Sequence, residues 1–387
     1  MAVKRITILG STGSVGTQTL DLISENQGLY EVCGLIGGRN VELLAAQAKQ
    51  FRPSITVISD EALLPALREA LAGENLAVAG GRDAVLEAAG RKVDWTMSAI
   101  TGIAGLEPTL AAVRHGGAIA FACKEALVSA GDVFLRAIEE ANATLLPVDS
   151  EHNAIFQAMA DGNSKSIEKI ILTASGGPFL KYSLEEMRGI SREAALRHPV
   201  WSMGAKISID SATMFNKGLE IIEAARLFGL SSERIEVLVH PQSIIHGMVC
   251  YADGSVLAQL GSPDMRIPIA HTLAWPERIA TKAPRLDLAA AAKLEFFAPD
   301  EVRLPALRLA REALQAGHGA PAVLNAANEI AVAAFLERKI GFLDIARIVE
   351  IVMGRLGAPP VDDLEAVLAL DAEARGQARA LTAEKAA

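Results

Sequence analysis

Two acidic side chains at the end of an apolar segment could bind a metal ion. The segment LLPVDSEHN, residues 145–153, places Asp149 and Glu151 directly after a run that is typical of a buried strand. If the extended backbone continues, residues two apart point to the same side, so both carboxylates could share one ion. Oxygen ligands without a cluster of Cys or His favour Mg²⁺ or Mn²⁺ over zinc. An ordinary acidic loop or a helix cap is the alternative for this segment alone.

A second polar cluster lies in SIDSATMFNKGLEIIEA, residues 208–224, where the pattern predicts a helix that begins near Ser211. Asn216 and Glu220 are four residues apart and share one helix face, with Lys217 adjacent. A helix N-terminus attracts anions, so this segment could bind an anion and a cation side by side. Charge pairing within the helix is the alternative, and we assign Glu223 to it.

Two loops could complete a site. In ASGGPF, residues 174–179, the amides of the glycine pair and the hydroxyl of Ser175 could bind an anionic oxygen. In HPVWSMGAKIS, residues 198–208, Trp201 and Met203 indicate an apolar lid. Trp201 could equally be a core aromatic side chain.

The first apolar run, residues 6–9, is followed at once by GSTGSVG, residues 10–16, and then by a helical pattern. Glycines at this place let backbone amides approach a pyrophosphate at the helix N-terminus. The spacing GxxGxxG differs from the commoner GxGxxG, and a simple tight turn is the alternative.

The second apolar run ends in LIGGRN, residues 35–40, which offers Arg39 where a protein that prefers NAD usually has an acidic residue. A guanidinium favours a 2′-phosphate through charge-assisted hydrogen bonds, so NADP(H) is the expected cofactor. A solvated surface arginine is the alternative.

Alternating elements must position these groups. Short apolar runs alternate with helical patterns from residue 3 to 148, which predicts an α/β fold with an N-terminal doubly wound, Rossmann-like parallel sheet. The predicted strands are residues 6–9, 32–36, 55–58, 95–100, 118–122 and 145–148. We therefore expect an NADPH-binding domain at 1–148, a central α+β catalytic domain at 149–275, a connector with several prolines at 276–303, and a small helical domain at 304–387.

Composition excludes several classes of protein. The 387 residues, 51% hydrophobic and 21% charged, can form more than one core. The net charge of −9 disfavours nucleic acid as a partner. No apolar stretch approaches the roughly 18 residues of a membrane span, and no targeting segment is recognised. Three cysteines, an odd number without the close spacing of a metal or redox pair, favour a reducing cytoplasm.

Several blocks resemble, in the same order, those of the 1-deoxy-D-xylulose 5-phosphate reductoisomerase family. They are GSTGS, ACKEALV, LLPVDSEHNAIFQ, SGGPF, HPVWSMGAKISIDSATMFNKGLE, HPQSIIH and NAANE. The resemblance covers nearly the whole chain, and its DSE and SATMFNKGLE blocks are highly specific. It implies a three-domain homodimer that uses NADPH and a divalent metal (Mn²⁺, Mg²⁺ or Co²⁺). Its reaction would convert 1-deoxy-D-xylulose 5-phosphate, a small phosphorylated sugar, into 2-C-methyl-D-erythritol 4-phosphate for isoprenoid precursors.

The resemblance also implies residue roles. The metal ligands would be Asp149, Glu151 and Glu220, and the catalytic residues Lys124 and Glu151. The substrate would contact Lys124, Ser150, Glu151, Ser175, His198, Ser211, Asn216, Lys217 and Glu220. The cofactor would contact Thr12, Gly13, Ser14, Val15, Gly38, Arg39, Asn40, Cys123, Glu125 and Gly204, and Trp201 and Met203 would form the lid. This sequence has Cys123 where the family usually has asparagine, which removes a side-chain amide from the nicotinamide half of the site.

For the mechanism we expect metal chelation to polarise the substrate ketone, Lys124 to add positive charge near the developing oxyanion, and Glu151 to transfer a proton. Two other functions are open. A plain NADP-dependent dehydrogenase of a small aldehyde would need no metal, and a non-catalytic NADP(H) sensor would bind NADPH without consuming it. Without the resemblance, the residues support only an NADP-linked, metal-using enzyme.

Overall fold

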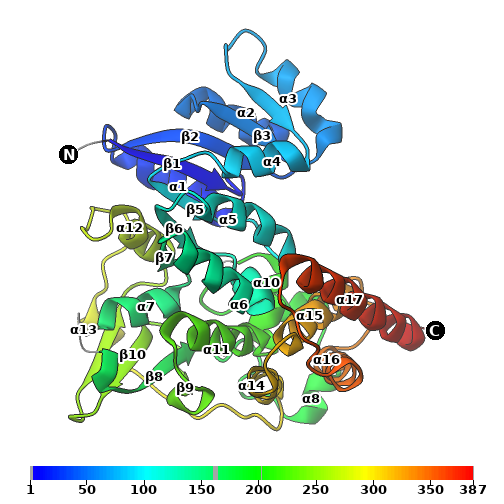
Figure 1. Cartoon of the computed structure of the whole chain (residues 1–387). Helices are drawn as coiled ribbons and strands as arrows, with labels where there is room; N and C mark the ends of the chain where they lie inside the picture. The colour runs from blue at the N-terminus through cyan, green and yellow to red at the C-terminus, as the bar shows by residue number, and fades with distance from the viewer. Residues whose placement is uncertain (1–2, 160–163, 202, 387) are drawn as a thin grey trace. The chain divides into compact units, whose positions relative to one another are not determined.

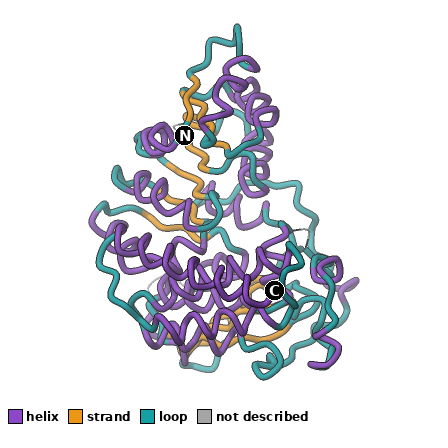
Figure 2. The backbone as a smooth tube through the Cα atoms, turned by 90° about the vertical axis from the view of Figure 1, so that its right-hand side faces the viewer, coloured by secondary structure: helices purple, strands orange, loops and turns teal. Residues whose placement is uncertain are grey.

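The computed structural model describes residues 3–159, 164–201 and 203–386. Contacts between Cα atoms divide the chain into two compact units. Unit 1 comprises residues 1–126, 134–153 and 264–284, and unit 2 comprises residues 127–133, 154–263 and 285–387. The strands form two separate sheets, one in each unit (Figure 2).

The sheet of unit 1 has seven parallel strands in the order β4-β3-β2-β1-β5-β6-β7 (Figure 1). Its strands are β1 (Lys4–Leu9), β2 (Tyr30–Gly37), β3 (Ile55–Ile58), β4 (Val78–Gly80), β5 (Trp95–Ser98), β6 (Ala118–Phe121) and β7 (Thr144–Pro147). The chain starts at the centre of the sheet, proceeds outward to β4 and returns to the other side of β1 at β5. This order confirms the predicted doubly wound sheet and places a switch point between β1 and β5.

Helices connect these strands. They are α1 (Ser14–Glu25), α2 (Val41–Phe51), α3 (Leu64–Ala70), α4 (Arg82–Ala89), α5 (Leu106–Val113), α6 (Lys124–Glu140), α7 (Ser150–Ala158) and α12 (Arg266–Ala274), with two short 3₁₀ turns, η1 (Glu61–Leu63) and η2 (Ile103–Gly105). Strand residues such as Ile6, Ile8 and Leu35 have no exposed surface, as expected for parallel strands covered on both faces. The helix α12 packs on α1, so residues 264–284 complete the core of unit 1.

The sheet of unit 2 has four strands in the order β11-β10-β8-β9. Its strands are β8 (Ile167–Ala174), β9 (Ile235–Val239), β10 (Ile245–Tyr251) and β11 (Val256–Leu260). The pair β8 and β9 is parallel, whereas β10 is antiparallel to both β8 and β11. A mixed sheet with helices in this part of the chain confirms the predicted α+β class.

The helices of unit 2 include the predicted C-terminal helical region. They are α8 (Leu184–Arg188), α9 (Arg192–Ala195), α10 (Ala205–Ala212), α11 (Phe215–Phe228), α13 (Leu288–Ala291), α14 (Ala306–Ala316), α15 (Ala320–Leu336), α16 (Asp344–Leu356) and α17 (Leu364–Ala386), with the 3₁₀ turns η3 (Ser164–Ser166) and η4 (Ser232–Arg234). The buried helix α15 packs against α10, α11, α14, α16 and α17. The division into two units is coarser than the predicted domain boundaries, which stay a prediction.

The prediction that a helix begins near Ser211 is wrong, because two helices share this segment. The helix α10 ends at Ala212 and α11 begins at Phe215, because Met214 adopts a left-handed backbone conformation with φ of 65°. The hydroxyl of Thr213 donates to the carbonyl of Ile209, at 2.9 Å, and so binds an acceptor in the last turn of α10. Ser211 therefore lies near the end of one helix rather than at the start of the other.

Among the helices in the described part of the chain, none has both the length and the apolar composition that crossing a membrane requires.

The side chain of His271, on α12, makes the stability of unit 1 depend on pH. Its Nδ1 atom accepts a hydrogen bond from the Asn153 amide at 3.1 Å, and burial, followed by the charge of Arg278, lowers its pKa from 6.5 to about 4. Since the folded pKa is depressed, the stabilisation is complete above about pH 6.5 and is lost as the pH falls toward 4.

We therefore predict that His271→Gln, which cannot titrate, loses less stability than the wild type between pH 7.5 and pH 5. The difference should be about 1 to 2 kcal/mol, after a discount for solvent screening at this half-buried site. Thermal unfolding of both proteins at the two pH values measures it. Equal losses in both proteins would contradict the role of His271.

Candidate active site

The glycine loop of unit 1 has the shape that the sequence predicts. Gly10 follows β1 with φ of +90°, and a Cβ atom there would lie 2.5 Å from the carbonyl oxygen of Ala99. A Cβ atom at Gly16 would lie 2.3 Å from the carbonyl oxygen of Gly10. Side chains at either position would therefore force the loop open, and the two glycines allow α1 to start immediately beside the switch point.

The N-terminus of α1 is accessible. Gly13 is the N-cap residue and has no side chain to bind the first amides, and both Gly13 and Ser14 are exposed. The predicted cofactor residues Thr12, Gly13, Ser14 and Val15 thus lie together at the N-terminus of α1. The free N–H groups of a helix's first turn attract anions such as phosphate.

Arg39 lies just beyond the carboxyl end of β2, the neighbour of β1. Its side chain is 83% exposed, and its Nε atom lies 3.1 Å from a carboxylate oxygen of Asp60. The neighbouring Asn40 is the N-cap of α2, where its side chain accepts a hydrogen bond from the amide of Leu43 at 3.0 Å. Asn40 therefore has a structural task, whereas Arg39, like Gly38 before it, faces solvent.

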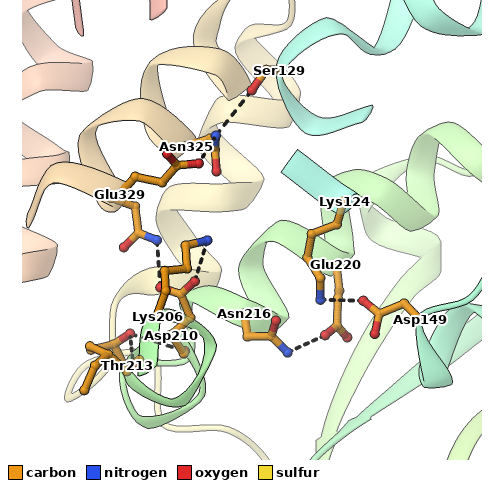
Figure 3. Close-up of polar contacts among 12 residues, drawn as sticks. Lys124, Ser129, Asp149, Lys206, Asp210, Thr213, Asn216, Glu220, Asn325 and Glu329 are labelled. Carbon is orange, nitrogen blue, oxygen red and sulfur yellow. Dashed lines mark hydrogen bonds and ion pairs between the residues drawn. The ribbon is translucent and has the colours of Figure 1, made fainter. Parts of the chain in front are cut away.

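Three further predicted residues begin α6. Cys123 is its N-cap and donates its thiol proton to the carbonyl of Gly102, with 3.3 Å between Sγ and the oxygen. Lys124 and Glu125, in the first turn, are buried. The ammonium group of Lys124 forms an ion pair with the carboxylate of Asp149 (Figure 3).

The backbone does not stay extended after β7, so that expectation is wrong. Ser150 begins α7, and the carbonyl of Asp149 accepts the first helical hydrogen bond, from Asn153 at 2.8 Å. Polar residues such as Asp and Ser favour this helix start. The carboxylate oxygens of Asp149 and Glu151 nevertheless lie within 4.8 Å of each other, because Glu151 is in the first turn.

Ser150 and His152 make contacts with the two carboxylates. The hydroxyl of Ser150 donates to a carboxylate oxygen of Glu151 at 2.6 Å. His152, which the sequence analysis did not select, is fully buried, and its Nδ1 atom lies 4.0 Å from a carboxylate oxygen of Asp149. Its position directly after the DSE block is the signal that could have found it.

In unit 2, Ser175 lies on a turn formed by two glycines with positive φ angles, 81° at Gly176 and 65° at Gly177. A Cβ atom at Gly177 would lie 3.0 Å from the Cα atom of Ala212, so this turn packs closely on the end of α10. The amide of Gly177 donates to the hydroxyl oxygen of Ser175 at 3.2 Å. The predicted anion-binding loop and Ser211 are thus neighbours.

His198 connects this loop to the predicted lid. Its Nδ1 atom accepts hydrogen bonds from the amides of Val200, at 3.2 Å, and Trp201, at 2.9 Å. Its Nε2 atom therefore carries the proton and donates to the hydroxyl of Ser175, at 2.9 Å. Burial lowers the pKa of His198, which favours this neutral form.

The residues of the predicted lid are half-buried. The ring of Trp201 lies 6.0 Å, centroid to centroid, from that of His246, and Met203 follows shortly after it. Gly204, predicted to contact the cofactor, is the exposed N-cap residue of α10.

The start of α11 holds the second polar cluster. Asn216 and Lys217 are in its first turn, and both donate to the carboxylate of Glu220, one to each oxygen. Figure 3 shows the contact between Asn216 and Glu220. Glu220 has no exposed surface and Lys217 only 3%. The next carboxylate on this face, Glu223, is also buried, with 1% exposed. Its spacing of three residues from Glu220 is the signal that could have found it, although the sequence alone is equally consistent with charge pairing within the helix.

The structure thus brings the predicted residues together in sets. Lys124, Asp149 and Glu151 form one set in unit 1, where the two carboxylates offer oxygen ligands beside an ammonium group. In unit 2, Ser175 and His198 form a second set next to the end of α10, and Asn216, Lys217 and Glu220 form a third at the start of α11. Hydroxyl, amide and ammonium donors of this kind suit an anion such as phosphate.

Family models match three parts of the chain. A model of 1-deoxy-D-xylulose 5-phosphate reductoisomerase matches residues 6–131, a model of its C-terminal domain matches residues 145–228, and a model of the DXP reductoisomerase C-terminal domain matches residues 260–377.

Individual relatives agree with these matches. The 1-deoxy-D-xylulose 5-phosphate reductoisomerase of Gluconobacter oxydans is 59% identical over 378 residues, which cover 97% of this chain and 93% of that one. The solved structure of the enzyme from Zymomonas mobilis, in complex with NADPH, has 53% identity and a TM-score of 0.94 and covers 99% of both chains. A DOX-P reductoisomerase structure in complex with NADPH, fosmidomycin and magnesium has 42% identity and a TM-score of 0.93 and covers 98% of both chains. The chain belongs to the 1-deoxy-D-xylulose 5-phosphate reductoisomerase family.

Proposed function

We propose that this protein converts 1-deoxy-D-xylulose 5-phosphate into 2-C-methyl-D-erythritol 4-phosphate, with NADPH as reductant and a divalent metal ion as cofactor. The observation that carries the proposal is the pair of carboxylates, Asp149 and Glu151, beside the ammonium group of Lys124, in a chain of this family. Relatives with 53% and 42% identity have been solved with NADPH, and the second also with magnesium.

The residues that follow the carboxyl ends of β1 and β2 in unit 1 fit NADPH. The N-terminus of α1 offers the amides of Ser14 and Val15, directly after Gly13, as donors for the pyrophosphate. The exposed guanidinium of Arg39 suits a 2′-phosphate. Gly38, Asn40, Cys123, Glu125 and Gly204 complete the proposed contacts, and at Cys123 the thiol proton goes to a backbone carbonyl.

The proposed metal ligands are Asp149, Glu151 and Glu220. Their chemistry fits a hard divalent cation, Mg²⁺, Mn²⁺ or Co²⁺, because all three are carboxylates. The proposal requires that Glu220, from unit 2, joins the two ligands of unit 1 around one ion. Two solved DOX-P reductoisomerase structures contain magnesium.

The substrate's phosphate would bind to unit 2. Ser175 and Ser211 offer hydroxyl groups, and Asn216 and Lys217 offer an amide and an ammonium group at the start of α11. His198 holds the hydroxyl of Ser175 through its Nε2 proton, at 2.9 Å. The same ring accepts a hydrogen bond from the amide of Trp201, so phosphate binding at Ser175 would shift the position of the lid, Trp201 and Met203. We propose that this lid closes over the substrate and excludes water.

When bound, the metal ion polarises the substrate's carbonyl group and NADPH supplies the hydride. The chain's own groups position and balance the charge. Lys124 is buried and fixed by its ion pair with Asp149, so its ammonium group can stabilise the negative charge that develops on a substrate oxygen. Glu151 is our candidate for proton transfer, and the hydroxyl of Ser150 holds one of its oxygens.

We also propose that the protein is a cytoplasmic homodimer that supplies isoprenoid precursors. The edge strand β11 supports dimerisation, because Val256 is 53% and Leu257 46% exposed on a strand with one unpaired edge. A second copy that pairs with this edge would cover both side chains. A solution mass of one chain, measured by light scattering, would contradict the dimer.

The first test of the function is turnover. Purified protein, mixed with 1-deoxy-D-xylulose 5-phosphate and NADPH, should lower the absorbance of NADPH, and a chelator should stop it. Adding Mn²⁺ or Mg²⁺ in excess over the chelator should restore the rate. Oxidation that resists the chelator would favour a plain dehydrogenase, and NADPH binding without oxidation would favour a sensor.

The second test separates the metal from the cofactor. Glu220→Gln keeps the size of the side chain but removes a metal ligand, so it should lower turnover at least about 100-fold and weaken metal binding. Its affinity for NADPH, measured by fluorescence, should stay within about threefold of the wild type. Arg39→Ala is the matched variant, since it should weaken NADPH binding about tenfold and leave metal binding unchanged. If each variant binds both the metal and NADPH more weakly, the metal site and the cofactor site are not separate.

A further inference from the structure

The helix α10 joins two parts of the proposed site. The lid residues Trp201 and Met203 precede it, and Ser211 is its second-last residue. The turn of Ser175 packs on its end, with a Cβ atom at Gly177 placed 3.1 Å from the carbonyl oxygen of Ser211. The position of α10 therefore fixes both hydroxyl groups that we assign to the phosphate.

A buried carboxylate holds this helix. Asp210, directly before Ser211, is 1% exposed. One of its oxygens accepts a hydrogen bond from the Nδ2 atom of Asn328 at 2.8 Å. The other lies 2.7 Å from the Nζ atom of Lys206, as Figure 3 shows for this pair. Both oxygens thus have a donor, as a buried charge requires.

The ion pair within α10 runs against the helix dipole. Lys206 is in the first turn and Asp210 in the last, whereas a cation is favoured at the C-terminus and an anion at the N-terminus. Helix stability alone therefore does not explain a lysine and an aspartate at these two positions. A contact outside the helix has to explain why a carboxylate is buried at position 210.

Asn328 provides this contact from a rigid element. It has no exposed surface and lies in α15, which packs against α10 and three helices of the C-terminal region. The hydrogen bond of Asn328 therefore holds the last turn of α10 against the core of unit 2. A displacement of about 1 Å in a binding group can reduce activity about 100-fold, so this hydrogen bond would affect how well Ser211 binds.

We propose that Asn328 and Asp210 are positioning residues, which hold α10 so that Ser211 and the Ser175 turn bind the substrate's phosphate. The inference rests on the proposed function. It assigns to the helical C-terminal region a part in substrate affinity, exerted through one hydrogen bond.

The test compares two equivalent asparagines of α15. Asn328→Leu should raise the KM for 1-deoxy-D-xylulose 5-phosphate about tenfold, with kcat and the Kd for NADPH within about threefold of the wild type. Asn325→Leu is the control, because Asn325 is equally buried but donates to Ser129 and Glu329 instead of α10. It should lower the Tm to a similar extent and leave this KM unchanged. An equal rise of KM in both variants, or in neither, would overturn the inference.

A charge-preserving exchange keeps the test decisive if the leucine variant does not fold. In Asp210→Asn combined with Asn328→Asp, the amide and carboxylate change places and can bond again. This double variant should have a KM closer to the wild type than either single variant has. If it is no better than the worse single variant, the inference fails. Wild-type protein that does not oxidise NADPH with this substrate would instead refute the proposed function.

Discussion

Burial of acidic side chains is the constraint on which the site depends. A carboxylate removed from water is costly unless a cation or several hydrogen-bond donors lie against it. Asp149 is paired with Lys124, and Glu220, with no exposed surface, accepts from Asn216 and Lys217. Each carboxylate is thereby held in place by a neighbour on its own unit. The same low-dielectric surroundings strengthen the attraction of these groups for a divalent ion.

The fold of unit 1 and the identity of most site residues could be predicted from the sequence, because both depend on local patterns. Apolar runs of four to eight residues form β1, β2 and β3, and the glycines after β1 allow the tight turn into α1. The short strand β4 was missed, since three residues carry too little pattern. The strand β10 was missed because His246 and Gly247 interrupt its apolar run.

Other details depend on contacts that no local pattern contains. The break between α10 and α11 at Met214 was not predicted, because the apolar periodicity continues across it. The start of α7 at Ser150 was likewise not predicted, although Asp and Ser are favoured at helix starts. The positions of His152 and Glu223 beside predicted ligands were a signal, but the burial of both side chains depends on the folded chain. Whether the residues predicted for metal and substrate act as we propose depends on chemistry that the turnover and binding experiments address.

The thiol of Cys123 has a practical consequence. It lies 1% exposed beside the proposed catalytic lysine, and none of the three cysteines, all buried, takes part in a disulfide. A thiol is modified as its accessible thiolate, so an alkylating reagent reaches this sulfur only through transient opening of the start of α6. The rate of alkylation at Cys123 would therefore measure how often the start of α6 opens beside the lysine.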